Sequence, residues 1–99
     1  MAAHKEGKIE AYFVEQVEAH GGITRKARWL CRRGCPDRFW AFRGTQGRGS
    51  SNGLAEIKPP GQPLKPHQWR ETNRLSEMGV EVVVIDSYEA VDLFVKRHA

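Results

Sequence analysis

Residues 54–58 read LAEIK, an apolar run that carries two charged side chains one residue apart. The run follows a turn-forming Ser-Ser-Asn-Gly and precedes Pro-Pro-Gly, which gives it the boundaries of a short β-strand. Side chains alternate between the two faces of a strand, so Glu56 and Lys58 share one face. An exposed charge pair is the simplest interpretation. A buried carboxylate, in contrast, needs a partner or a cation.

Two more strands are predicted before this run. Residues 23–31 mix basic and apolar side chains and predict a strand, after which Arg32-Arg33-Gly34 turns the chain. Residues 36–43, PDRFWAFR, are rich in aromatic side chains, and a proline is tolerated where a strand begins. Glycine, serine and asparagine dominate residues 44–53, which predicts a hairpin connection between PDRFWAFR and LAEIK.

Helical patterns flank the three strands. Between Lys8 and His20 the apolar residues recur at helical spacing, and Gly21-Gly22 ends the pattern. Pro66 suits the first turn of a helix that runs to about Met78.

The C-terminal part of the chain predicts one strand and one helix. Residues 80–86, VEVVVID, have the composition of a buried strand. Ser87 can cap a last helix that carries apolar residues between Ala90 and Val95. The predicted order of elements is therefore αβββαβα, without internal repeats.

Length and composition favour a single domain over residues 1–99. A chain of 99 residues with 39% hydrophobic content can build one core. No apolar run approaches the roughly 18 residues of a membrane span, and the polar N-terminus lacks the apolar segment of a signal peptide. Cys31 and Cys35 have no second pair that would complete a zinc set, so we expect reduced thiols in a cytoplasmic protein.

Positive charge concentrates in one segment of the chain. The net charge is +4, but residues 25–48 contain eight basic residues and one acid, a net of +7, which leaves −3 for the remainder. A phosphate-binding surface would produce this distribution, and so would a solvated basic face.

Two carboxylates stand out against this basic background. Asp37 begins one predicted strand and Glu56 lies in its hairpin partner, so the two can meet near one end of the sheet. Oxygen ligands gathered in this way suit a hard divalent ion such as Mg²⁺. Alternatively, Asp37 is a turn residue that satisfies backbone donors.

The sequence resembles the PD-(D/E)xK nucleases in Pro36-Asp37 followed by Glu56-Ile57-Lys58. More closely, it resembles the VRR-NUC family (virus-type replication-repair nucleases), whose pattern is matched over nearly the whole chain. The further matching segments are Lys8–Tyr12, Arg33–Arg38, Pro66–Gln68, Val84–Ser87 and Glu89–Val91. The resemblance implies an α/β fold with a restriction-endonuclease-like αβββαβ core and an additional C-terminal helix. Cys35, where an aliphatic residue is common in the family, leaves the carboxylates untouched.

The resemblance also implies roles for individual residues. Asp37 and Glu56 would bind Mg²⁺ or Mn²⁺, with the backbone carbonyl of Ile57 as a further ligand. Lys58 would position or deprotonate the attacking water and stabilise charge on the scissile phosphate. Glu10 would hold a metal directly or through water.

Gln68 would support the same site from the helix that follows the sheet. A polar residue in the first turn of a helix needs no function, however, which is the alternative for Gln68. For Glu10 the alternative is an exposed acidic helix face shared with Glu15 and Glu18.

Contacts with DNA are predicted for four arginines. Arg32, Arg33 and Arg38 belong to the basic segment, and Arg48 lies at the glycine-rich hairpin tip, where it would enter a groove or simply be solvated. The three tryptophans could stack on bases, but in a domain of this size they are more often core or dimer contacts. They are Trp29, Trp40 and Trp69.

The leading hypothesis is a metal-dependent DNA endonuclease that is selective for branched DNA such as a four-way (Holliday) junction. Cutting a junction symmetrically needs two active sites, which predicts a C₂ homodimer. No organic cofactor and no membrane partner are expected, and the bacterial or phage-infected cytoplasm is the expected location. The alternative is a nucleic-acid-binding module without catalysis, in which residues 25–48 grip phosphates and the carboxylates are structural.

Overall fold

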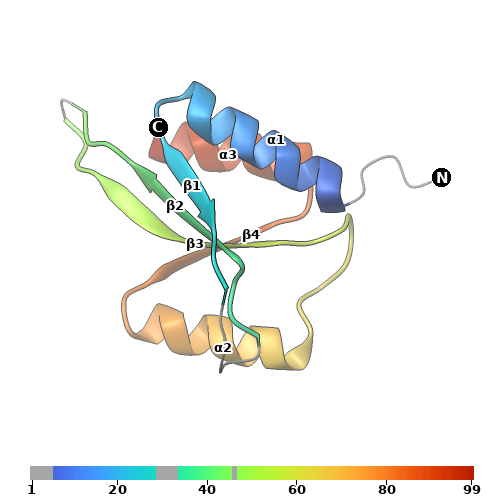
Figure 1. Ribbon diagram of the computed structural model, residues 1–99. Helices are drawn as coiled ribbons and strands as arrows, with labels where there is room; N and C mark the ends of the chain where they lie inside the picture. Colours follow the sequence, from blue (N-terminus) through green and yellow to red (C-terminus); the bar gives the residue numbers. More distant parts are fainter. Residues whose placement is uncertain (1–5, 29–33, 46) are drawn as a thin grey trace.

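Residues 54–57 of LAEIK lie in a strand of a four-stranded mixed sheet in a computed structural model that describes residues 6–28, 34–45 and 47–99 (Figure 1). The element order αβββαβα is confirmed. The elements are α1 (Glu6–Ala19), β1 (Ile23–Lys26), β2 (Arg38–Phe42), β3 (Ser51–Ile57), α2 (Pro66–Glu77), β4 (Glu81–Ile85) and α3 (Tyr88–His98). Among the described residues, no helix combines the length and the apolar content that crossing a bilayer requires.

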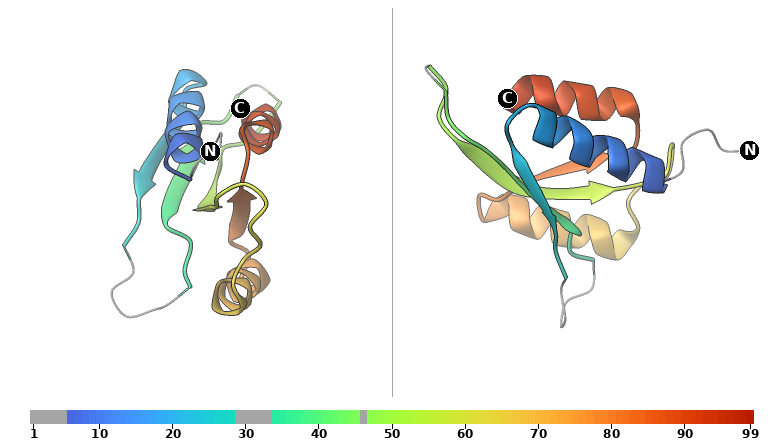
Figure 2. Two further views of the ribbon diagram at one scale, coloured as in Figure 1. Left: turned by 90° about the vertical axis from the view of Figure 1, so that its right-hand side faces the viewer. Right: turned by 45° about the horizontal axis from the view of Figure 1, so that its top comes forward.

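The sheet has the strand order β1-β2-β3-β4. The strands β1, β2 and β3 form an antiparallel meander, whereas β4 joins β3 in parallel after a crossover through α2. The helices α1 and α3 lie side by side on one side of the sheet, and α2 lies on the other (Figures 1 and 2). The only central strands are thus β2 and β3, which carry or border the predicted carboxylates.

The core fills the space between the sheet and the pair α1/α3. Three residues spaced four apart on α1 are fully buried, as the helical pattern predicts: Ile9, Phe13 and Val17. Trp40 from β2 is fully buried and meets Phe94 of α3 edge to face, with 4.8 Å between ring centroids. Its indole N–H donates to the carbonyl of Leu54 at 3.0 Å, so the large side chain leaves no unpaired polar group.

Gly53 allows Trp40 and β4 to approach β3 closely. A Cβ at this position would lie 2.3 Å from the carbonyl oxygen of Glu81 and 2.7 Å from the Trp40 ring. Only glycine therefore fits between them without a shift of the backbone.

Several boundaries and environments differ from the prediction. The strand β1 ends at Lys26, whereas the prediction extended it to residue 31. The last three residues of the predicted strand, 29–31, lie outside the described part of the chain. The strand β2 begins at Arg38, because Pro36 has no N–H for a sheet hydrogen bond. The expectation of a buried β4 is wrong: only Ile85 is buried, because β4 is an edge strand with β3 as its single neighbour.

The tryptophans divide between core and surface. The structural assignment of Trp40 is confirmed by its burial, whereas Trp69 on α2 is 58% exposed and is not a core residue. Since Glu71 is the one buried residue of α2, this helix leaves most of its length in solvent. Trp29 lies outside the described residues.

We expect Trp40→Ala to lower the free energy of unfolding by about 3–5 kcal/mol, because it opens a cavity and removes the contacts with Phe94. Trp69→Ala is the matched control on the surface and should cost about 0.5 kcal/mol or less. Urea unfolding followed by circular dichroism measures both. Equal losses in the two variants would contradict the assignment of Trp40 to the core.

Candidate active site

Asp37 and Glu56 lie at the same end of the β2–β3 hairpin. The antiparallel register pairs Arg38 with Ala55, so the next position beyond this pair sets Asp37 opposite Glu56. Residues opposite each other in antiparallel strands are neighbours. Glu56 is buried, and the negative charge of Asp37 acts on it electrostatically. The structure thus brings together two carboxylates that are 19 residues apart in the sequence.

Gln68 connects Glu56 with Lys58. The Lys58 ammonium donates to Oε1 of Gln68 at 3.2 Å, and Nε2 of Gln68 donates to Oε2 of Glu56 at 3.3 Å. Oε1 of Gln68 also accepts the backbone N–H of Lys65 at 2.9 Å, which caps the N-terminus of α2. One amide therefore links Glu56 with Lys58 and also caps the helix.

Glu56 and Lys58 are both buried, with exposed fractions of 7% and 6%. Lys58 follows directly after β3, and its backbone N–H continues the pairing with β4 by donating to the carbonyl of Ile85 at 2.8 Å. The interpretation of LAEIK as an exposed charge pair is therefore wrong. The backbone of the sheet and the amide of Gln68 hold both groups in place instead.

Burial shifts the protonation of Glu56. Loss of solvent and, to a smaller extent, the negative charge of Asp37 raise the pKa of its carboxyl to about 7, against the opposing effect of the Lys58 charge. A divalent cation beside the two carboxylates would relieve the same repulsion.

Asp37 offers a second sign of a cation site. Its Oδ1 atom is buried and has no hydrogen-bond partner, whereas its Oδ2 lies 3.5 Å from the ammonium of Lys26. A buried carboxylate oxygen without a partner costs free energy, and a bound cation would remove that cost. Asp37 and Glu56 therefore offer carboxylate oxygens of the kind that a hard divalent cation accepts.

Glu10 is held by two cations on α1's side of the sheet. Its Oε2 lies 2.6 Å from Nη1 of Arg38 and 2.9 Å from the ammonium of Lys26. Burial alone would raise the pKa of Glu10, but these two hydrogen bonds outweigh it and lower the pKa. Glu10 is therefore not part of an exposed acidic face. Within the described residues, no group of three or more His, Cys, Asp and Glu side chains is arranged around one metal position.

The arginines predicted to bind DNA have different environments. The guanidinium of Arg38 is engaged with Glu10 and with Oγ1 of Thr24, at 2.6 and 3.1 Å. Arg48 is exposed in the hairpin tip, where its backbone pairs with Thr45. Arg32 and Arg33 lie outside the described residues.

Lys26 is a residue of the candidate site that the sequence did not indicate beyond its place in the basic segment. The strand register sets Lys26 opposite Arg38, and its ammonium contacts both Glu10 and Asp37. Alternation along β1 could have indicated its face, but its carboxylate partners come from α1 and from the residue before β2. Only the assembled sheet reveals this contact.

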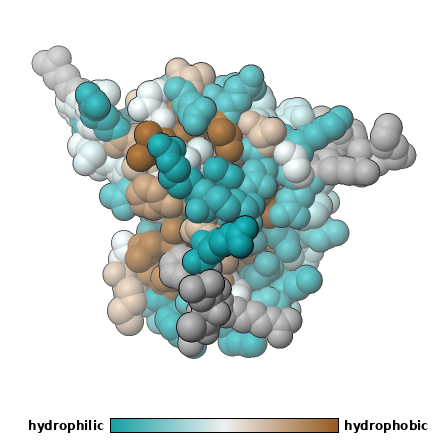
Figure 3. All heavy atoms as spheres, viewed as in Figure 1, coloured by the Kyte–Doolittle hydropathy of each residue, from teal (hydrophilic) through white to brown (hydrophobic). Residues whose placement is uncertain are grey.

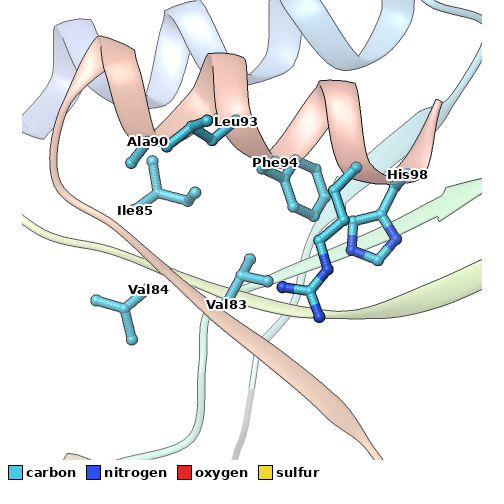
Figure 4. A pocket seen from close by; sticks show the side chains of 8 residues that line it. Val83, Val84, Ile85, Ala90, Leu93, Phe94 and His98 are labelled. Atoms are coloured by element: carbon cyan, nitrogen blue, oxygen red, sulfur yellow. The ribbon is translucent and has the colours of Figure 1, made fainter.

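A separate apolar cavity of about 230 Å³ lies between β4 and α3 (Figure 4). Its lining includes Val83, Val84 and Leu93, with His98 at one end. The imidazole of His98 is tied to Glu81 at 2.9 Å and to Ser51 at 3.3 Å. None of the predicted site residues lines this cavity, so the carboxylate cluster remains the candidate active site.

Known proteins are similar to this chain in sequence and in fold. No family model matches the chain. The chain is 38% identical over 88 residues to "Putative nuclease p44" of Acyrthosiphon pisum secondary endosymbiont phage 1, which covers 86% of either protein. A solved structure described as "VRR_NUC domain" superposes with a TM-score of 0.82 at 33% identity and covers 98% of this chain and 100% of its own.

The chain belongs to the VRR-NUC family. The α/β fold implied by the motif resemblance is confirmed, with the C-terminal helix α3 following β4. The four-stranded mixed sheet with three helices is the restriction-endonuclease-like fold of this VRR-NUC chain.

The raised pKa of Glu56 makes a prediction for the metal-free VRR-NUC protein. The folded state holds a proton on Glu56 that the unfolded chain releases at its ordinary pKa of 4.5, so stability falls as the pH rises from about 4.5 through 7. Glu56→Gln removes this titration while keeping a hydrogen-bond acceptor for Gln68. We expect it to stabilise the protein by about 1–2 kcal/mol at pH 8 and by little at pH 4.5.

Thermal unfolding in EDTA between pH 4.5 and 8 measures this effect. Glu89→Gln, at an exposed position in the first turn of α3, is the matched control and should leave the pH dependence of the wild type unchanged. A metal-free wild type whose stability rises steadily over this range would contradict the assignment.

Proposed function

We propose that this VRR-NUC protein is a divalent-metal-dependent endonuclease that hydrolyses phosphodiester bonds of DNA. The observation that carries the proposal is the set of contacts Glu56–Gln68–Lys58 beside an Asp37 oxygen that has no hydrogen-bond partner. Burying a carboxylate and an ammonium lowers the stability of the fold, so a purely structural role does not explain why both are buried here. Linked by one amide, they place a negative and a positive charge side by side in the candidate active site. The nuclease name of the phage relative supports the same assignment.

The carboxylates provide the place for the metal. Asp37 and Glu56, with the carbonyl of Ile57, would hold Mg²⁺ or Mn²⁺, which would supply charge stabilisation on the phosphate and activation of water. Glu10 would support this set from α1, directly or through water.

Lys58 provides a fixed positive charge beside the carboxylates. Its ammonium is held by Gln68, and its burial removes the water that would otherwise screen it. A phosphate next to Glu56 would meet this ammonium in place, so charge that develops on the phosphate is stabilised without rearrangement. Gln68 acts as a positioning residue, because it orients both Glu56 and Lys58.

DNA is the proposed partner, and the basic segment is the proposed contact. Figure 3 shows hydrophilic side chains over much of the face that carries α1 and β1, with apolar residues gathered on one side of it. The exposed Arg48 at the hairpin tip would contact phosphates at a distance from the active site. Arg32 and Arg33 are proposed DNA contacts from the basic segment of the sequence. Arg38 would act on the site through Glu10. We propose that residues 1–99 act as one nuclease domain in a bacterial or phage-infected cytoplasm.

We further propose that the substrate is branched DNA, such as a four-way junction, and that two copies act together. The open edge of β4 and the exposed side chains of Val84 and Leu93 provide a surface for a second copy. Two copies related by a twofold axis would present two active sites to the two strands that a junction requires to be cut.

Asp37→Asn should abolish cleavage while DNA binding survives, because the substitution removes a metal-binding charge and leaves the fold intact. We expect a loss of at least about 10³-fold in the cleavage rate with Mg²⁺ or Mn²⁺, and unchanged or tighter binding in a gel-shift titration. Asp92→Asn is the matched control, since Asp92 accepts the Tyr12 hydroxyl on the outer side of α1 and α3. It should retain wild-type cleavage.

The substrates for this test are linear, nicked, flap and four-way DNA. A wild type that binds but never cuts any of them with either metal would leave the nucleic-acid-binding module as the function. Equal activity of wild type and Asp37→Asn would remove Asp37 from the site.

Leu93→Glu should convert the proposed dimer to a monomer, because it places a charge in the surface formed by β4 and α3. Met78→Glu introduces the same charge at another exposed apolar position and should leave the dimer intact. Light scattering coupled to gel filtration gives the mass of each variant. On a four-way junction we expect single nicks from Leu93→Glu and paired cuts from wild type. A wild type that is a monomer at cleavage concentrations would contradict the dimer.

A further inference from the structure

Lys26 forms a contact that joins two carboxylates of the candidate site. Its ammonium lies 2.9 Å from Oε2 of Glu10 and 3.5 Å from Oδ2 of Asp37. These carboxylates come from α1 and from the residue before β2, and a single cation at the end of β1 contacts both of them. In the metal-free protein, Lys26 therefore stands beside the carboxylate that would hold the metal, at its Oδ2 atom.

The two cations on Glu10 differ in how firmly they are held. The guanidinium of Arg38 is 11% exposed, and Nε of Arg38 donates to Oγ1 of Thr24, which itself donates to the carbonyl of Phe39. The side chain of Lys26 is 54% exposed. A flexible, solvent-exposed lysine loses little when it turns toward water, whereas the arginine would break a buried network. Lys26 is thus the cation that can leave.

Coulomb repulsion favours the departure of Lys26 when a metal binds. An ammonium beside Asp37 attracts the carboxylate but repels a divalent cation on the same carboxylate. Once the metal is present, Asp37 no longer needs Lys26 for neutralisation, and Glu10 still keeps Arg38. Exchange of Lys26 for the metal therefore leaves both Asp37 and Glu10 paired with a cation before and after metal binding.

We propose that Lys26 is an internal counter-ion of the metal-free site, which competes with the metal for Asp37 and thereby weakens metal binding. The inference rests on the proposed metal-dependent function and concerns the metal-binding step alone. Lys26 holds the carboxylates together while the metal is absent and gives up this contact to the incoming ion.

Lys26→Met tests the inference, because it keeps the length and apolar stem of the side chain and removes only the charge. We expect the dissociation constant for Mn²⁺ to decrease about three- to tenfold in calorimetric titrations of the protein without DNA. Lys26→Arg retains the charge and should bind Mn²⁺ no more tightly than wild type. Should Lys26→Met fail to fold, Lys26→Gln replaces it with the same expected gain.

Arg25→Met is the matched control. Arg25 lies next to Lys26 on β1, points to the other face of the strand, and donates to the carbonyl of Thr24. This variant changes the net charge of the protein by the same amount, so it measures the long-range contribution of one positive charge. We expect its affinity for Mn²⁺ to change less than twofold.

The outcomes separate this inference from the proposed function. A folded wild type that does not bind Mn²⁺ at millimolar concentration would overturn the proposed metal-dependent function, and the inference with it. If wild type binds Mn²⁺ and Lys26→Met binds it equally or more weakly, the counter-ion role is overturned while the proposed function stands. A gain of equal size in Lys26→Met and Arg25→Met would also overturn it, because net charge alone would explain the effect.

Discussion

The amide of Gln68 is the interaction on which the rest of the candidate site depends. It accepts from Lys58 and donates to Glu56, and it caps α2 at the same time. Because the amide has both a donor and an acceptor end, it can serve a carboxylate and an ammonium together, which no single charged side chain could do. The same amide therefore fixes both the position of α2 against the sheet and the geometry of the two buried charges.

The end of the β2–β3 hairpin adds the remaining carboxylate. The register of this hairpin places Asp37 beside Glu56. Trp40 of β2 stabilises the hairpin, because its ring packs against Phe94 of α3 and its indole N–H donates a hydrogen bond to the carbonyl of Leu54. Gly53 lets β4 and the Trp40 ring approach from either side. The aromatic core thus positions the acidic end of the sheet.

Charge balance divides the site into two halves. Glu56 is shared between the amide of Gln68 and the field of Asp37, whereas Glu10 is neutralised by Arg38 and Lys26. Lys26 is the link between the halves, since its ammonium reaches Asp37 as well as Glu10. This arrangement explains how a chain with several acidic groups at one sheet end remains folded before any metal is present.

The sequence by itself determined the order of the elements, the strand nature of LAEIK and the family, because periodicity, turn residues and short motifs are local properties. The pairing of Asp37 with Glu56 followed from the predicted hairpin. The burial of Lys58, the exposure of Trp69 and β4, and the double role of Gln68 were decided by tertiary structure, since each depends on which element packs against which. Lys26 shows the reason most clearly: its two carboxylates are 16 and 11 residues away in the chain, and only the folded sheet brings them to one ammonium.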